Sequence, residues 1–221
     1  MKENDIQDTL CPLCHTPVSD FIACYGVPQR QCPKCRSVER QRVFWRLYSK
    51  GVFGAGLLDG KRVLHISPSI PERYMFKHLV RASVTTVDIR ESCRPDLVAD
   101  ISSMPGVKDS SFDLVFISYV FTCTKLLQKA IAEISRVLAP GGVLLSYDVL
   151  KEGLTEEYSD LAYITQHYGL ENFEKLGIGT FRAFGVDDYR DFFSPFFSTA
   201  LHMENDIPTD RATYWLKGVK L

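Results

Sequence analysis

The 221-residue sequence has no long apolar run and no large excess of charge of either sign. No segment approaches the ~18–20 apolar residues of a membrane span, so no membrane partner is expected. The first ten residues, MKENDIQDTL, are polar and partly acidic, unlike the apolar centre of a secretory signal peptide. A hydrophobic content of 45% and a charged content of 24% are typical of a globular protein. We therefore expect a soluble protein of the cytoplasm.

The formal net charge of −1 argues against a general electrostatic hold on nucleic acid. The segment 30–50 differs from the rest, because it contains seven Lys or Arg residues and a single acid, Glu39. A local anionic partner is therefore compatible with the sequence. A small-molecule acceptor with an anionic group fits this pattern better than RNA does.

Four of the seven cysteines form two C-x-x-C pairs that are separated by 17 residues, namely Cys11 with Cys14 and Cys32 with Cys35. Each pair can present two sulfur atoms to one ion, and the spacer allows the pairs to complete a tetrahedron. Thiols of a cytoplasmic protein are more often metal ligands than disulfides. The spacing predicts a zinc ribbon over residues 1–36 with a structural zinc ion. The pattern leaves open whether the ribbon binds substrate or is only a structural cap.

A helix is expected after the ribbon, capped by Ser37 and running to about Lys50. Apolar residues four positions apart give it a buried stripe, while Arg42, Arg46 and Lys50 form a basic face. Solvated surface is the ordinary role of such a face. Several glycines before Lys61 indicate a linker, so residues 37–60 are predicted to connect the ribbon to a larger domain.

Strand and helix patterns alternate over residues 61–221, which predicts an α/β domain. The expected strands are 62–66, 84–88, 97–100, 112–118 and 143–147, with helices over 69–81 and 125–138. Two late strands, 198–204 and 212–219, are expected to form a final antiparallel pair. The prediction is a doubly wound, Rossmann-like sheet, which binds ligands at the carboxyl ends of its strands.

The first loop of this sheet, Ser67-Pro68-Ser69, lacks the G-x-G-x-x-G pattern of dinucleotide sites. Ser69 and Glu72 instead form a capping box for the next helix. Asp88 lies 21 residues after Ser67, close to the spacing at which an acid binds ribose hydroxyls. A ligand with ribose but no pyrophosphate suits these features, and S-adenosylmethionine is such a ligand.

Several further motifs occur in a specific order: C-R-S-V-E-R-Q-R from Cys35, V-L-H-I-S-P from Val63, R-V-L-A-P-G-G from Arg136 and R-A-F-G from Arg182. Together with the ribbon, they resemble class I S-adenosylmethionine-dependent methyltransferases of the type-11 group that carry an N-terminal zinc ribbon. The resemblance spans nearly the whole chain and implies a methyltransferase enzyme with S-adenosylmethionine and structural zinc.

The resemblance also implies roles for individual residues. Asp88 would bind the ribose hydroxyls, and Asp100 and Ile101 would flank the adenine. The residues expected near the methionine part of the cofactor are His65, Ser67, Pro68 and Ser69. Ser118 and Tyr119 would face the methyl group and the acceptor. The candidates for a general base are Tyr119, His167, Asp148 and Tyr147. A core role for His65, and a strand-end turn role for the two acids, are the alternatives.

The sequence departs from the family pattern at three places: the first loop has no glycine, Thr180 replaces an expected histidine, and Tyr119-Val120-Phe121-Thr122 replaces a histidine-containing run. Three functions are therefore compared. The first is methyl transfer to a small or medium-sized metabolite, such as a saccharide or natural-product intermediate. The second is ribosomal RNA methylation, and the third is a non-catalytic binding protein. The sequence identifies neither the acceptor nor the oligomeric state.

Overall fold

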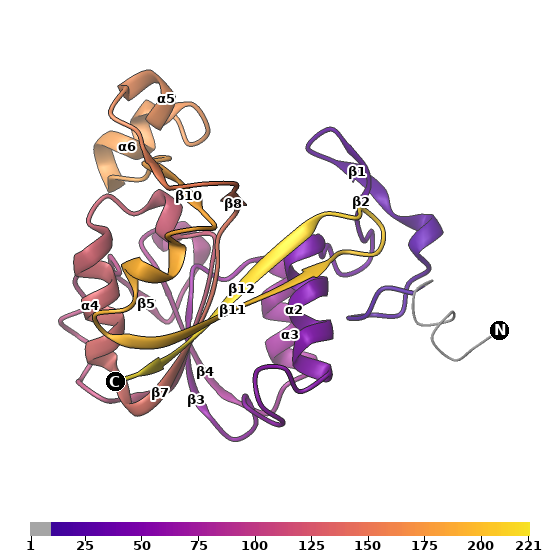
Figure 1. Cartoon of the computed structure of the whole chain (residues 1–221), viewed down its shortest axis with the longest axis horizontal. Coiled ribbons are helices and arrows are strands. Elements are labelled where there is room, and N and C mark those ends of the chain that lie inside the picture. The colour runs from indigo at the N-terminus through magenta and orange to yellow at the C-terminus, as the bar shows by residue number, and fades with distance from the viewer. Residues whose placement is uncertain (1–9) are drawn as a thin grey trace. The chain divides into compact units, whose positions relative to one another are not determined.

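The computed structural model describes residues 10–221, so the polar start and the first part of the predicted ribbon lie outside the described residues. The chain forms two compact units, each built from separate stretches of sequence (Figure 1). The first unit contains the described residues up to Gly60, together with 69–82 and 203–214. The second contains residues 61–68, 83–202 and 215–221. The predicted domain boundaries remain a prediction.

The first unit contains a β-hairpin and two helices. Its elements are η1 (Val18–Asp20), β1 (Ile22–Cys24), β2 (Val27–Gln31), α2 (Glu39–Ser49) and α3 (Ile70–His78). The capping box of α3 is confirmed, because Ser69 donates its N–H to Glu72 at 2.9 Å. The predicted cap of α2 is wrong: the N-cap is Val38, and the Ser37 hydroxyl lies 3.2 Å from the Cys35 sulfur instead.

The second unit contains the main sheet and its connections. Its elements are β3 (Arg62–Ile66), β4 (Ser83–Asp88), η2 (Glu91–Cys93), β5 (Leu97–Val98), β6 (Phe112–Ser118), η3 (Phe121–Cys123), α4 (Leu127–Val137), β7 (Leu138–Tyr147), β8 (Leu150–Lys151), β9 (Glu156–Glu157), α5 (Leu161–Thr165), α6 (Leu170–Leu176), β10 (Arg182–Gly185) and η4 (Tyr189–Phe192). Two strands, β11 (Phe197–Asn205) and β12 (Ala212–Lys220), begin or end in the first unit.

The seven-stranded sheet has the order β11-β12-β7-β6-β3-β4-β5. The pairs from β7 to β5 are parallel, whereas β12 runs antiparallel to β7. The strand order reverses between β3 and β6, which confirms the predicted doubly wound fold with a late antiparallel strand. Residues 140–142 of the R-V-L-A-P-G-G motif lie within β7, and the pairing of β7 with β6 shifts register between Leu138 and Val143.

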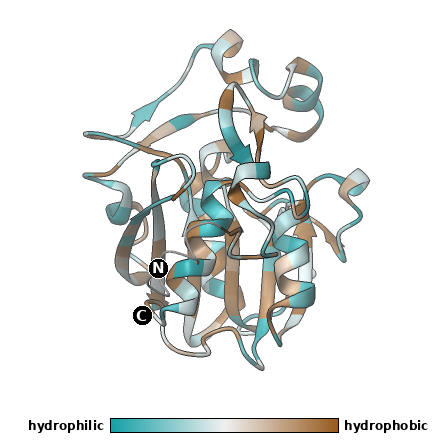
Figure 2. Ribbon diagram, turned by 90° about the vertical axis from the view of Figure 1, so that its right-hand side faces the viewer, coloured by the Kyte–Doolittle hydropathy of each residue, from teal (hydrophilic) through white to brown (hydrophobic). Residues whose placement is uncertain are grey.

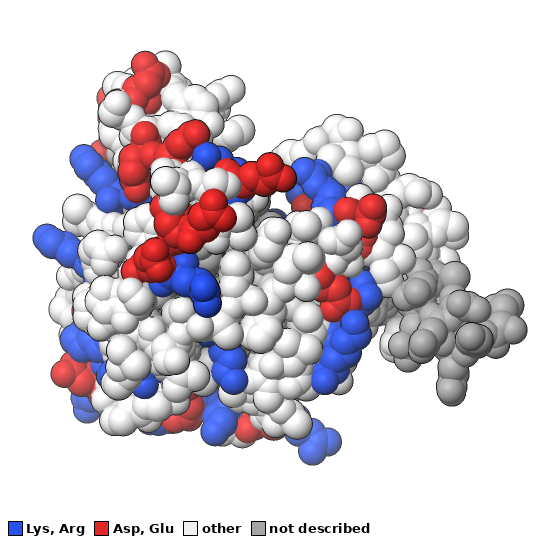
Figure 3. Space-filling model, viewed as in Figure 1, with Lys and Arg blue, Asp and Glu red and all other residues white. Residues whose placement is uncertain are grey.

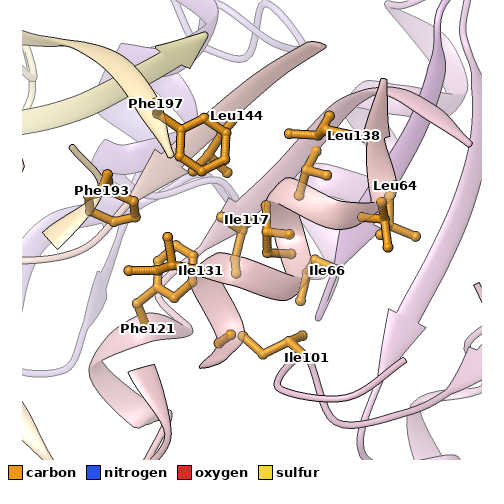
Figure 4. Close-up of a cluster of buried hydrophobic side chains, with 14 of the residues drawn as sticks. Leu64, Ile66, Ile101, Ile117, Phe121, Ile131, Leu138, Leu144, Phe193 and Phe197 are labelled. Carbon is orange, nitrogen blue, oxygen red and sulfur yellow. The ribbon is translucent and has the colours of Figure 1, made fainter. Parts of the chain in front are cut away.

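The core of the second unit lies between the sheet and α4. Leu64, Ile66, Ile117 and Leu144 on the strands pack with Ile131 on the helix, and all are fully buried (Figure 4). Apolar residues also run along the strands themselves (Figure 2), as expected for parallel strands that are buried on both faces. This packing fixes the strand ends, and with them the side chains that follow each strand.

The described part of the chain contains no helix that is both long enough and apolar enough to cross a membrane.

Candidate functional site

A cavity of about 250 Å³ lies at the carboxyl ends of the parallel strands of the second unit. Ser67 follows β3, Asp88 ends β4 and Tyr119 follows β6, and all three line it. Asp100 and Ile101 line it as well. The volume is close to the lower end of the range for small-molecule sites, ~300–1,000 Å³. Five residues of the predicted site therefore meet at one cavity.

The Asp88 carboxylate is the most highly connected group of this cavity. It is 3% exposed and accepts hydrogen bonds from the Ser67 hydroxyl at 2.9 Å and the Arg90 backbone N–H at 2.8 Å. The Arg90 guanidinium adds Nε and Nη2 contacts at 3.1 and 3.2 Å. Burial acts to raise the pKa of Asp88, but the hydrogen bonds from Arg90 and Ser67 hold it below its ordinary value. The carboxylate is therefore ionised at neutral pH.

Arg90 occupies acceptor positions that a bound ligand would need. A carboxylate offers about four acceptor positions, and the contacts of Ser67 and Arg90 account for all of them. The Arg90 side chain is 42% exposed, so it has room to move. Ligand hydroxyls at Asp88 would replace the guanidinium and leave the Ser67 and backbone contacts in place.

Ser67 has a backbone conformation that favours glycine. Its φ is +47°, in the left-handed region, which costs a non-glycine residue roughly 1–2 kcal/mol. Two hydrogen bonds hold it there: its N–H donates to the Val87 carbonyl at 2.7 Å, and its hydroxyl donates to Asp88. In this glycine-free loop, a serine takes the left-handed conformation that glycine usually takes, and its hydroxyl orients Asp88.

The other predicted cofactor-binding residues do not line the cavity. His65 is 1% exposed and its ring meets Phe116 edge-on, with centroids 5.2 Å apart. Pro68 is half-buried, and Ser69 is the N-cap of α3 in the first unit. Ser118 is buried directly before Tyr119. Of the two predicted catalytic residues, Tyr119 lines the cavity, whereas His167 is exposed and does not.

The lining residues that were not predicted from the sequence include Arg90, Cys123 and Tyr168. The Cys123 sulfur and the Tyr168 hydroxyl lie 3.1 Å apart. Burial raises the pKa of Cys123 to about 11 and raises that of Tyr168 as well, so both are neutral at pH 7. The position of Arg90, two residues after a strand-end acid, is a signal that could have identified it. No comparable signal marks Tyr168.

The η3 wall of the cavity, Phe121–Cys123, is held by two buried charged residues. Asp148, directly after β7, accepts from the Thr122 N–H at 3.1 Å and the Thr122 hydroxyl at 2.9 Å. Arg182 on β10 donates to the carbonyls of Phe121 and Thr124, both at 2.7 Å. Burial raises the pKa of Asp148 to about 6, against the hydrogen bonds that it accepts. Asp148 does not line the cavity.

Arg182 is the first residue of the R-A-F-G motif, and Gly185 is the last. Steric crowding explains why this last residue is a glycine. A Cβ at Gly185 would lie 2.1 Å from the Gly153 carbonyl oxygen, so only glycine allows this approach. The R-A-F-G motif therefore contributes the Arg182 hydrogen bonds that hold η3 and the close backbone approach of Gly185 to Gly153.

The four predicted metal ligands of the first unit form one cluster. Their sulfur atoms all lie within 4.8 Å of one another, and all four residues are buried. The printed separations are 3.7 Å for Cys11 and Cys35 and 3.5 Å for Cys14 and Cys32. Tetrahedral zinc with Zn–S bonds of about 2.3 Å places its sulfurs ~3.8 Å apart. The cluster therefore fits a tetrahedral ion. Cys24, between the two pairs in the sequence, does not belong to it.

Residues 57–146 match the family model of the type-11 methyltransferase domain. This segment is similar to a methyltransferase domain, and we refer to it below by that name. It contains β3, β4, β6 and nearly all of β7, and thus also Ser67, Asp88, Asp100 and Tyr119. The cavity described above is therefore largely made by the methyltransferase domain.

Two curated relatives match part of this chain over part of their own length. A malonyl-[acyl-carrier protein] O-methyltransferase of Coxiella burnetii is 29% identical over 103 residues, which are 47% of this chain and 36% of that protein. A sterol 4-C-methyltransferase of Caenorhabditis elegans is 35% identical over 72 residues, 33% of this chain and 21% of that protein. The chain thus spans only about a third or less of the length of these relatives.

A solved structure shows the same fold over most of the chain. The 1,6-didemethyltoxoflavin-N1-methyltransferase of Burkholderia thailandensis, which contains S-adenosylhomocysteine, superimposes with a TM-score of 0.54 at 14% identity. The match covers 80% of this chain and 85% of that one. The chain therefore shares the fold of that methyltransferase.

The residues of the methyltransferase domain fit S-adenosylmethionine. The Ser118 hydroxyl, at the carboxyl end of β6, is buried and has no hydrogen-bond partner among the described residues. Ser118 does not line the cavity, so this hydroxyl is not evidence for a ligand; Ser67 and Tyr119, which do line it, carry hydroxyl groups. Asp88 at the neighbouring edge of the cavity offers carboxylate oxygens, and Ile101 offers an apolar surface. Donor, acceptor and apolar groups thus occur together.

Proposed function

We propose that this protein transfers the methyl group of S-adenosylmethionine to a small or medium-sized metabolite. The observation that carries the proposal is the Asp88 carboxylate, ionised and buried at the end of β4 on the wall of the cavity. The partial matches to a malonyl-[acyl-carrier protein] O-methyltransferase and a sterol 4-C-methyltransferase support an acceptor other than nucleic acid.

The methyl donor supplies, when bound, an activated electrophilic methyl group. Asp88 would bind ribose hydroxyls after Arg90 moves aside, and Asp100 and Ile101 would border the adenine. Ser67 orients Asp88 through its hydroxyl. Tyr119 lies at the end of β6, where a side chain would face the acceptor. These residues bind and align reactants, which alone can supply several kcal/mol of barrier lowering.

General base catalysis is a smaller part of the proposal. The two titratable groups Cys123 and Tyr168 are neutral at pH 7 and so are weak bases there. Tyr119 is our candidate for contact with the acceptor, and His167 remains a prediction from the sequence alone. An acceptor that carries no proton on the attacking atom, or loses it after attack, suits this cavity best.

We also propose that the four-cysteine cluster binds one structural zinc ion. Four buried sulfur ligands leave no open coordination position, which is typical of structural rather than catalytic zinc. Cys11, Cys14, Cys32 and Cys35 would hold the ion as thiolates. Since the ribbon has a small core, metal binding would supply much of its folding free energy.

Acids neutralise most of the basic segment 30–50, which weighs against the alternative of RNA methylation. Arg30 pairs with Glu39, Arg40 with Glu72 and Arg42 with Asp206, while Arg46 and Lys50 share Glu204. On the face shown in Figure 3, basic side chains are scattered among acidic ones. A strongly salt-dependent RNA affinity would support the RNA alternative instead.

The direct test of the proposal is a calorimetric titration of S-adenosylmethionine and S-adenosylhomocysteine. We expect micromolar dissociation constants for the wild type and affinity weaker by at least about tenfold, or ~1.4 kcal/mol, for Asp88→Ala. Glu91→Ala is the control, because this exposed acid on η2 does not line the cavity. Equal affinity in the wild type and both variants would show that Asp88 does not bind the cofactor. The absence of binding in all three proteins would favour the alternative of a non-catalytic binding protein.

A further inference from the structure

A second, larger cleft lies entirely within the first unit. Its volume is about 720 Å³, well inside the range of small-molecule sites. One wall is formed by α2 and its C-cap, a second by residues 10–18 around the first C-x-x-C pair, and a third by residues 206–208 between β11 and β12. None of its lining residues belongs to the cavity of the methyltransferase domain. It therefore requires an explanation of its own.

The α2 wall of the cleft has more positive than negative charge. Arg42 lines the cleft, but its guanidinium is neutralised by Asp206 through bonds of 2.8 and 2.6 Å. Arg46 and Lys50 share the single carboxylate of Glu204, which does not line the cleft. Two cations thus border the cleft with one carboxylate between them. Lys50 is 56% exposed and so can also contact a ligand.

The two cations have a spacing that suits a phosphate chain. Arg46 lies in the last turn of α2 and Lys50 is the C-cap four residues later, so they lie on one face, about 6 Å apart along the helix axis. Guanidinium and ammonium groups are the common side-chain partners of phosphates. The exposed hydroxyl of Ser49 lines the cleft beside them and adds a neutral hydrogen-bonding group.

Flat and apolar groups border the rest of the cleft. Trp45, one residue before Arg46, lines it and is half-buried. Ile207 and Pro208 line it from the β11–β12 connection. Indole and apolar side chains are suitable partners for the faces of a heterocyclic ring, and base–aromatic stacking is worth ~1–3 kcal/mol. The cleft therefore combines a surface for a ring with a surface for anions.

We propose that this cleft binds a nucleoside diphosphate group, with the base against Trp45 and the diphosphate on Arg46 and Lys50. The site is separate from that of the methyl donor and does not depend on the proposed methyl transfer. A small molecule that carries such a group, for example as an activated sugar, would be the occupant.

The test is a titration of the full-length, metal-loaded protein with uridine diphosphate, inorganic pyrophosphate and uridine. We expect uridine diphosphate to bind at least about fivefold more tightly than pyrophosphate, and uridine to bind more weakly than either. Fluorescence gives an independent signal, because the second tryptophan, Trp215, is fully buried and Trp45 alone can contact a ligand in the cleft. Equal affinity for pyrophosphate and uridine diphosphate would overturn the ring assignment.

Variants locate the binding. Lys50→Gln and the double variant Arg46→Gln/Lys50→Gln should weaken uridine diphosphate binding, the double variant by about tenfold or more. Trp45→Ala should weaken uridine diphosphate binding but leave pyrophosphate binding unchanged. Lys129→Gln, at an exposed lysine on α4, is the matched control and should bind as the wild type does. A melting curve verifies that each variant is folded. The absence of binding to the wild type at millimolar ligand, or unchanged binding in the double variant, would overturn the proposal.

Discussion

At the scale of single residues, Asp148 shows how burial and hydrogen bonding oppose each other. The residue is 1% exposed and accepts from the Tyr189 hydroxyl at 3.1 Å in addition to its two bonds from Thr122. These neutral donors do not compensate fully for the loss of hydration, so its pKa rises from 3.8 to about 6. Asp148 therefore helps to hold the cavity wall but lowers stability when it is ionised.

Asp148→Asn should stabilise the protein, and more so at higher pH. The native carboxyl keeps its proton up to about pH 6, whereas the unfolded one loses it near pH 4, so wild-type stability falls as the pH rises through this window. An asparagine does not titrate, and its oxygen can still accept from Thr122. We expect the stability difference between variant and wild type to widen by about 1 kcal/mol from pH 5 to 7.5.

Urea unfolding of both proteins at several pH values measures this difference. The pH dependence of zinc–thiolate binding is the same in both proteins, so it cancels in the difference between their unfolding free energies. A difference that does not change with pH would show that Asp148 has an ordinary pKa in the folded protein.

At the scale of elements, α2 is held to the β11–β12 connection by the ion pair of Arg42 and Asp206. Both side chains are 1% exposed, and Arg42 also donates to the carbonyls of Arg30 and Ser37 at 2.9 and 2.8 Å. The sequence predicted that the basic face of Arg42, Arg46 and Lys50 is solvated. Arg42, the first of these residues, is instead buried in an ion pair that holds the structure together. One arginine connects the hairpin, the helix and a distant part of the chain.

Replacing one residue of the Arg42–Asp206 pair should lower the free energy of unfolding more than replacing both. Arg42→Met leaves a buried carboxylate without a cation and is expected to cost ~3–5 kcal/mol. The double variant Arg42→Met/Asp206→Leu leaves no lone charge and should cost clearly less than the sum of the single variants. Urea unfolding of the four proteins gives the coupling energy. Arg62→Met, which breaks the exposed pair with Asp113, should cause a much smaller loss. Additive single effects would contradict the account.

The elements of the sheet were more predictable than their contacts. The strand 112–118 was predicted with its correct bounds, because apolar runs and turn residues are local signals. The position of Asp88 followed from the end of its strand. By contrast, Arg42 and Asp206 are 164 residues apart, and nothing local indicates that they meet. Tyr168 lines the cavity although the sequence favoured its neighbour His167, since the direction of a side chain in a short connection is set by tertiary packing.

At the scale of the whole molecule, the chain combines a unit built on the main sheet, with its own core, and a unit that contains the proposed zinc site. The core of the second unit contains residues from all its major strands and α4. The first unit has buried apolar side chains such as Phe44, Phe53 and Met75 and, in addition, the four-sulfur cluster. The two units should therefore respond differently to loss of the metal.

The zinc proposal predicts one zinc ion per chain and a partial loss of structure on its removal. Cys14→Ser should lower the zinc content, because three thiolates bind the ion less well. Cys24→Ser is the matched control, since Cys24 lies between the pairs but outside the cluster, and it should keep one zinc ion. Metal analysis measures the content, and circular dichroism after chelation should retain the signal of the sheet. Equal zinc loss in both variants, or none in either, would contradict the assignment.

The most direct measurement of the central claim is a crystal structure of the protein with S-adenosylhomocysteine. The account predicts that the ribose hydroxyls bind the Asp88 carboxylate, that the Arg90 guanidinium has moved from the position it holds here, and that Ile101 borders the adenine. The nucleoside bound away from the ends of β3 and β4, or an Asp88 still fully bonded to Arg90 beside it, would contradict the account.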